Sequence, residues 1–116
     1  YGQSLTISRE IKNQNIESSA LYNLGLTFFR LRQYEKAKNH LEQSLIIERQ
    51  NKSRRNEAYA LYWLGYSYGL IGLREKKLQY LQQALEIFQE IKDYENEVHI
   101  LTDLSTIGSN KEKNLQ

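Results

Sequence analysis

The sequence predicts an all-α fold, an α-solenoid in which antiparallel helix pairs stack on one another. The segments Leu21–Gly25 (LYNLG), Leu61–Gly65 (LYWLG) and Leu101–Ser105 (LTDLS) lie forty positions apart. A fixed period in this range is typical of repeat arrays. Around the first segment the apolar residues recur at spacings of three and four, as on one face of a helix: Ala20, Leu21, Leu24, Phe28 and Leu31. The chain also has no proline and six glycines, which favours long helices over a multi-stranded sheet.

Composition and length restrict the class of protein further. The 116 residues are enough for one small domain, and the formal charge of +2 creates no strong field for polyanions. The absence of cysteine excludes a disulfide framework, and a reducing cytoplasm is the expected location. No apolar run is long enough to span a membrane, and no signal peptide begins the chain. Because the chain opens in mid-pattern, we expect a piece of a longer protein.

The forty-residue period predicts a repeat domain over residues 1–108. Its expected parts are a second helix of a truncated repeat (1–12), two full repeats (17–56 and 57–96), a first helix of a further repeat (97–108) and a polar, frayed tail (109–116). A polar turn should separate the first two parts, with Asn13 or Asn15 as a helix N-cap. Ser53 and Asp93 are the expected N-caps of later helices.

Two glycines lie in the middle of predicted first helices, where each costs about 1 kcal/mol relative to alanine. Gly25 and Gly65 recur forty residues apart, so we expect them to allow close approach of the paired second helix. The small residues Ser44 and Ala84 should face these contacts. Gly72 follows a helix end and should be its left-handed C-cap.

The pattern Leu-x-x-Leu-Gly-x-x-aromatic, followed by a turn and Ala-x-x-x-large-x-x-small, resembles the tetratricopeptide repeat. The matching positions are Leu21, Leu24, Gly25, Phe28, Tyr34, Ala37, Leu41 and Ser44 in one repeat, and Leu61, Leu64, Gly65, Tyr68, Gly72, Leu81 and Ala84 in the next. The ordinary period is 34; the longer one here is similar to kinesin light chains, to Leu-Gly-Asn-repeat adaptors and to many bacterial signalling proteins. Lys77 stands where the family prefers alanine.

The resemblance implies a right-handed superhelix whose first helices line a concave groove. It therefore implies a scaffold that binds an extended peptide or a partner domain. The expected ligand-facing residues are Tyr22, Asn23, Leu26, Tyr59, Tyr62, Trp63 and Tyr66. Asn23 precedes Leu-Gly, where the long-repeat branch often has an asparagine that holds the ligand's backbone. Pure packing between neighbouring helices is the alternative role of the aromatic residues, because a helix that is apolar on nearly every side is either buried or binds something.

The sequence offers little for catalysis or cofactors. His40 and His99 are the two histidines, and neither stands in a spacing typical of metal ligands. No glycine-rich phosphate loop and no catalytic serine motif is present. We therefore expect no enzyme activity, no cofactor and no metal.

Two further functions stay open. The chain is alternatively a structural or self-association segment of a bacterial regulator, with uncapped apolar ends around Leu5 and Leu101. The basic turn 49–55, with Arg49, Lys52, Arg54 and Arg55, is alternatively a contact for nucleic acid or another anionic partner. A solvated turn near a helix C-terminus also explains these charges, because the helix dipole favours cations there. Nucleic acid is not the expected partner.

Overall fold

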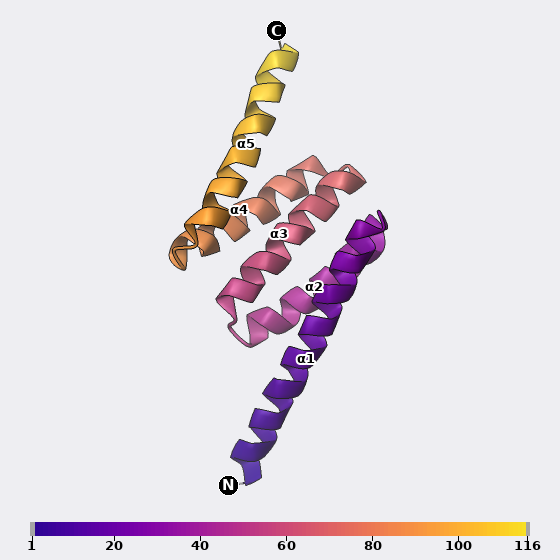
Figure 1. The fold of residues 1–116 in the computed structure, drawn as a ribbon, viewed down its shortest axis with the longest axis vertical. Coiled ribbons are helices and arrows are strands. Elements are labelled where there is room, and N and C mark those ends of the chain that lie inside the picture. Colours follow the sequence, from indigo (N-terminus) through magenta and orange to yellow (C-terminus); the bar gives the residue numbers. More distant parts are fainter. Residues whose placement is uncertain (1, 116) are drawn as a thin grey trace.

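Five helices make up the described part of the chain, so the predicted all-α fold is confirmed (Figure 1). The structure is a computed structural model that describes the backbone of residues 2–115 and the side chains of residue 10 and residues 12–105. The helices are α1 (Gly2–Arg30), α2 (Tyr34–Gln50), α3 (Arg54–Ile71), α4 (Arg74–Glu90) and α5 (Tyr94–Leu115). None of the described helices is both long and apolar enough to cross a membrane.

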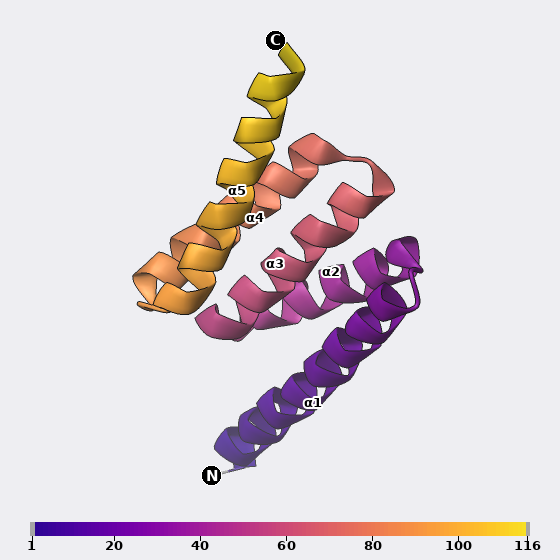
Figure 2. The same ribbon diagram turned by 45° about the horizontal axis from the view of Figure 1, so that its top comes forward.

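Each helix packs mainly on its neighbours in the chain, as expected of a solenoid. The molecule is elongated, with extents of 67 × 31 × 19 Å. Figures 1 and 2 show α1, α3 and α5 running in similar directions, with α2 and α4 between them in the chain order and largely behind them. The backbones of α1 and α3 also come into contact, whereas those of the described α2 and α4 do not. The side on which α1 and α3 meet is therefore the inner side of the stack. α5 runs in a similar direction, although its described backbone does not contact that of α3.

All four turns between the helices have the same hydrogen-bonded form. One or two residues after each helix end the backbone is left-handed, at Arg32 (φ 64°), Lys52 (φ 57°), Gly72 (φ 105°) and Lys92 (φ 60°). The next amide donates back to a carbonyl five residues earlier, as Leu73 does to Tyr68 at 2.8 Å. This is the Schellman cap. Its recurrence at positions forty apart confirms both the period and the predicted role of Gly72.

The left-handed lysine at the turn between α2 and α3 gives a testable prediction. Lys52→Gly is expected to raise the free energy of unfolding by about 1 kcal/mol, because glycine removes the Cβ strain of φ > 0. Gly72→Ala is the matched opposite change and is expected to cost about 1 kcal/mol, since no atom lies within 4 Å of the added Cβ and only the φ of 105° opposes it. Urea unfolding measures both. A Lys52→Gly protein less stable than the wild type would contradict this account.

Both ends of the chain differ from the prediction. α1 is continuous through residues 13–17, so the expected turn is wrong. The described residues of the segment 1–12 do not form a separate helix, and Asn13 and Asn15 are not caps. The segment 13–17 holds no glycine or proline, and asparagine alone costs only a few tenths of a kcal/mol in a helix. The Asn15 side chain instead accepts a hydrogen bond from Asn51 at 3.0 Å. At the other end α5 runs from Tyr94 to Leu115, so the helix does not end at residue 108, and the described residues of the expected frayed tail, 109–115, are helical.

The predicted caps had different outcomes. Asp93 is confirmed, because its Oδ1 accepts a hydrogen bond from the backbone N–H of Asn96 at 3.3 Å. Hydrogen bonds from Asn96, aided by the Arg55 guanidinium, lower the pKa of the Asp93 carboxyl. Ser53 stands at the N-cap position of α3, as predicted, but its side chain makes no cap hydrogen bond.

The core lies between α2, α3 and α4. Its fully buried members include Leu41, Leu61, Leu64, Leu81, Ala84 and Phe88. Gly25 and Gly65 are both buried at close helix contacts, as predicted. The side chains nearest to them are Leu41 and Leu81, however, and not Ser44 and Ala84.

The outer faces of α1 and α5 leave apolar side chains exposed. Leu24 is 45% exposed, whereas Leu64, forty positions later, is fully buried in the core. Leu101 is 45% exposed and Leu61 is fully buried. The expectation of an open apolar face around Leu101 is thus confirmed, while Leu5 lies outside the described side chains. Self-association through these faces stays a prediction.

Candidate functional site

Aromatic side chains join the three inner helices in one continuous set, which we term the aromatic surface. Its rings are Phe29 from α1, Tyr62, Trp63 and Tyr66 from α3, and His99 from α5. Trp63 packs edge-on against Phe29 and Tyr62, each with ring centroids 5.2 Å apart. Tyr62 also contacts Tyr66 at 4.8 Å and His99 at 5.8 Å. The Phe29 and α3 rings are half-buried, so they both pack between repeats and leave part of each ring exposed.

Two tyrosine hydroxyls on this side of the molecule stay protonated at neutral pH. Burial raises the pKa of Tyr62, and the nearby Asp103 charge raises it further. Burial also raises the pKa of Tyr22. Both phenols therefore remain available as hydrogen-bond donors.

Beside the aromatic surface lies a polar cavity of about 340 Å³ between α1, α2 and α3, which we term the polar pocket. Its lining residues are Ser18, Ser19, Tyr22, Asn23, Ser44, Glu48, Asn56 and Tyr59. Ser18, Ser44 and Glu48 are buried and form the floor, whereas Tyr22 and Tyr59 are half-buried walls. Ser19, Asn23 and Asn56 are exposed and form the rim.

The floor of the polar pocket is a hydrogen-bonded cluster that joins α1 to α2. The hydroxyls of Ser18 and Ser44 lie 2.9 Å apart, and Ser44 also donates to the Ser18 carbonyl at 3.3 Å. Ser18 donates to Oε1 of Glu48. The other carboxylate oxygen, Oε2, is buried and has no hydrogen-bond partner in the described part of the chain. The pocket thus has an unsatisfied acceptor at its base.

Comparison with protein families assigns the scaffold. Two family models, both described as tetratricopeptide repeat, match residues 18–51 and residues 59–90. The chain belongs to the tetratricopeptide repeat family. Tetratricopeptide repeats generally mediate protein–protein interaction and are typically non-enzymatic scaffolds. A search of curated proteins gives no match.

The structure of this tetratricopeptide repeat chain divides the predicted ligand-facing residues into two groups. Tyr22, Asn23 and Tyr59 line the polar pocket, and Tyr62, Trp63 and Tyr66 belong to the aromatic surface. The Tyr66 hydroxyl is buried without a hydrogen-bond partner among the described residues, and the Lys77 ammonium lies 5.2 Å from its ring. Leu26 is half-buried on α1 and is not among the residues that line the pocket.

Sequence reasoning missed the floor of the pocket. The sequence predicts Ser44 only as a small packing residue and does not point to Glu48. They can be identified by comparing each residue with the one forty positions later: in the next tetratricopeptide repeat, Ala84 stands in place of Ser44 and Phe88 in place of Glu48. Polar residues at positions that are apolar in the equivalent repeat indicate a local role other than packing.

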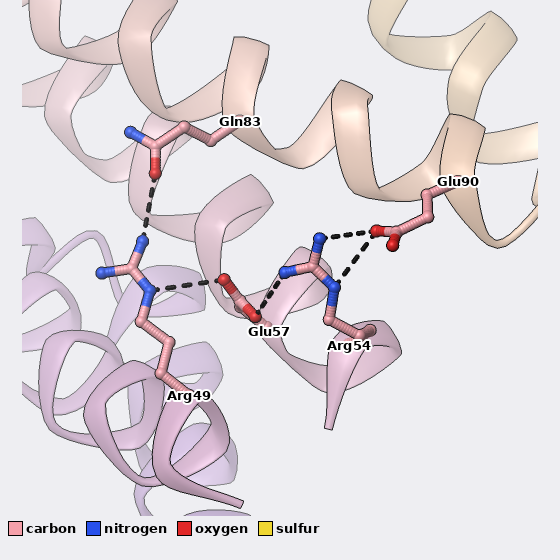
Figure 3. A network of polar contacts seen from close by, with 5 residues as sticks. All are labelled: Arg49, Arg54, Glu57, Gln83 and Glu90. Carbon is pink, nitrogen blue, oxygen red and sulfur yellow. Dashed lines mark hydrogen bonds and ion pairs between the residues drawn. The ribbon is translucent and has the colours of Figure 1, made fainter. Parts of the chain in front are cut away.

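The basic turn holds the two full repeats together. Figure 3 shows Arg49 between Glu57 and Gln83, and Arg54 between Glu57 and Glu90. Arg49 donates from Nε to Glu57 Oε2 at 3.3 Å and from Nη2 to Gln83 Oε1 at 3.0 Å. Arg54 donates from Nη1 to Glu57 Oε1 and from Nε to Glu90 Oε2, each at 3.1 Å. These five side chains come from α2, α3 and α4, and Glu57 is only 8% exposed. Arg55 likewise pairs with Asp93 at 3.0 Å. These contacts favour the structural role for the turn, because the three guanidinium groups already have acceptors within the chain.

Proposed function

We propose that the inner surface of this repeat domain binds an extended peptide from a partner protein. The observation that carries the proposal is that the polar pocket and the aromatic surface are built on the same two helices, α1 and α3. Tyr22 and Tyr59 line the pocket from these helices, and Phe29 packs against Trp63 between them with ring centroids 5.2 Å apart. A ligand that follows the inner side meets exposed amides first and half-buried rings next. The proposed partner is a protein, and the proposed setting is the cytoplasm of a cell in which this chain is part of a larger protein.

The chemistry of the two areas suits an extended segment. Aromatic rings bury large areas at low cost in side-chain entropy and dominate interface energies once water is excluded. The exposed amides of Asn23 and Asn56 at the rim each offer donors and an acceptor for a peptide backbone. The pocket supplies a recess in which one side chain of the peptide is held.

The test begins with selection of random peptides of about twelve residues, displayed on phage, against the chain. Tyr62→Ala and Trp63→Ala are each expected to weaken binding of a selected peptide by about 30-fold, equivalent to about 2 kcal/mol, if these rings are hot spots. Ile46→Ala is the matched control, because Ile46 is 58% exposed on α2, outside the inner helices. Titration calorimetry measures all three. Loss of binding in Ile46→Ala, with no change in Tyr62→Ala or Trp63→Ala, would contradict the proposal.

A further inference from the structure

The polar floor of the pocket is not required by the fold. Forty residues later, Ala58, Ala84 and Phe88 stand in place of Ser18, Ser44 and Glu48, and all three are fully buried. Phe88 packs edge-on against Tyr59 with ring centroids 5.5 Å apart. The same helix contact is therefore built from apolar side chains alone in the second repeat.

The polar version is the energetically unfavourable one. Burying a carboxylate without a paired charge is costly, and an apolar replacement of similar size is often neutral or stabilising. Glu48 is 5% exposed, one of its oxygens accepts only from Ser18, and the other has no partner in the part of the chain that the structure describes. The adjacent Arg49 does not compensate it, because its guanidinium binds Glu57 and Gln83.

The lining of the pocket is suited to a positive charge. It contains one carboxylate, three serine hydroxyls, two asparagine amides and two tyrosine rings, and no lysine or arginine. Carboxylates form strong charge-assisted hydrogen bonds with ammonium and guanidinium groups. Tyrosine rings attract the same groups by cation–π interaction, which strengthens when the cation is desolvated.

We propose that the polar pocket binds a cationic side chain, lysine or arginine, of the bound peptide, with Glu48 as its counter-charge. The inference rests on the proposed function that the inner surface binds an extended peptide. The partner's cation supplies the missing ion pair, so the burial cost of Glu48 is offset only in the complex. The pocket then acts as a specificity element that favours peptides with one basic residue at a fixed position.

The first test uses small cations that represent the two side chains, so it does not depend on knowing the peptide. n-Butylammonium and n-propylguanidinium, with neutral n-pentanol as the matched uncharged probe, are titrated into the ¹⁵N-labelled chain. Saturable shifts of the Ser18, Ser44 and Glu48 amides are expected with either cation, at least tenfold tighter than with n-pentanol. Equal binding of n-pentanol, or no saturable shift with any probe, would overturn the inference.

Variants of the floor separate charge from shape. Glu48→Gln keeps the size of the side chain and removes its charge, so it is expected to weaken binding of the cations at least tenfold. Glu86→Gln is the matched control, because it removes an exposed carboxylate on α4. The triple variant Ser18→Ala/Ser44→Ala/Glu48→Phe copies the second repeat and is expected to fold at least as stably while losing the cations. Unchanged cation binding in either floor variant would overturn the inference.

Phage selection distinguishes failure of this inference from failure of the proposed function. Selection on the wild type is expected to enrich one basic position, and selection on Glu48→Gln is expected to lose that preference. Enriched peptides with no basic position would overturn the cation pocket and leave peptide binding intact. Cation binding without any enriched peptide would overturn the proposed function and leave the cation pocket standing.

Discussion

Gly65→Leu is expected to lower the free energy of unfolding by about 3 kcal/mol, one of the largest effects of a single substitution in this chain. Gly65 is buried in the middle of α3, and a Cβ at that position would lie 3.0 Å from Cγ of Leu81 and 3.3 Å from the Lys77 carbonyl oxygen. The three further carbons of leucine have no free volume there. Overpacking a core contact typically costs 1–3 kcal/mol and occasionally more, so we place this change at about the upper end. Thermal and urea unfolding measure it.

Alanine substitutions provide graded controls for the same argument. Gly25→Ala is expected to destabilise more than Gly65→Ala, because its Cβ would lie 2.7 Å from Cγ of Leu41. The gain of about 1 kcal/mol in helix propensity applies at both positions. It offsets a larger part of the cost at Gly65, where the added Cβ would lie 3.0 Å from Cγ of Leu81. If Gly65→Leu unfolds at the wild-type temperature, the close helix contact is not what retains glycine here.

The second large effect comes from a pair of facing positions, one with a large side chain and one with a small side chain, whose order is reversed between the two repeats. Phe29 and Ala37 in the first repeat correspond to Gly69 and Lys77 in the second. The Lys77 stem lies over Gly69, with Cδ 2.6 Å from the position of an added Cβ, and its ammonium lies over Tyr66. A lysine at a position where the family prefers alanine is thus accommodated because the residue opposite has no side chain.

Gly69→Phe alone is therefore expected to destabilise the chain by about 2 kcal/mol through overpacking. Lys77→Ala alone is expected to cost about 1 kcal/mol through the lost stem packing and cation–π contact. The double variant copies the first repeat and is expected to recover to within about 1 kcal/mol of the wild type. A double-mutant cycle from urea unfolding should give a coupling energy of about 2 kcal/mol. If the free-energy costs of the two substitutions simply add in the double variant, the side chains at positions 69 and 77 do not compete for the same space.

Much of the fold follows from the sequence because its signals are local and repeated. The Leu-Gly segments, the apolar spacing and Gly72 each specify a helix or a helix end without reference to the rest of the chain. The left-handed conformation of Arg32, Lys52 and Lys92 was not predictable in this way. A basic residue carries no intrinsic preference for positive φ, and the Schellman hydrogen bonds impose that conformation.

Helix α1 shows a different limit. Its largely polar segment 13–17 resembles a turn in composition, yet nothing in it forbids helical dihedrals. The helix therefore continues, and Asn15 finds a partner in Asn51 across the α1–α2 contact. A boundary that depends on such tertiary contacts cannot be located from propensity alone.

Only part of the candidate site can be located from the sequence, because some of its residues share one helix and others come together only in the folded chain. Helical spacing places Tyr59, Tyr62 and Tyr66 on one face, so sequence reasoning finds the walls of the inner surface. The floor of the polar pocket forms only when α1 packs on α2. That contact brings Ser18 next to Ser44 and Glu48, which lie 26 and 30 residues later in the sequence. Such a cluster becomes visible only when the two repeats are compared position by position.

The central claim, that the inner surface of the repeats is the binding surface, is tested most directly by paramagnetic NMR. A selected peptide carrying a nitroxide label is titrated into the ¹⁵N-labelled chain, and the broadening of each amide and of the Trp63 indole N–H is measured. The account predicts strong broadening of Asn23, Tyr62 and the Trp63 indole, with little effect at Ile46. Broadening centred on Ile46 or on the turn at Arg54, with the Trp63 indole unaffected, would contradict it.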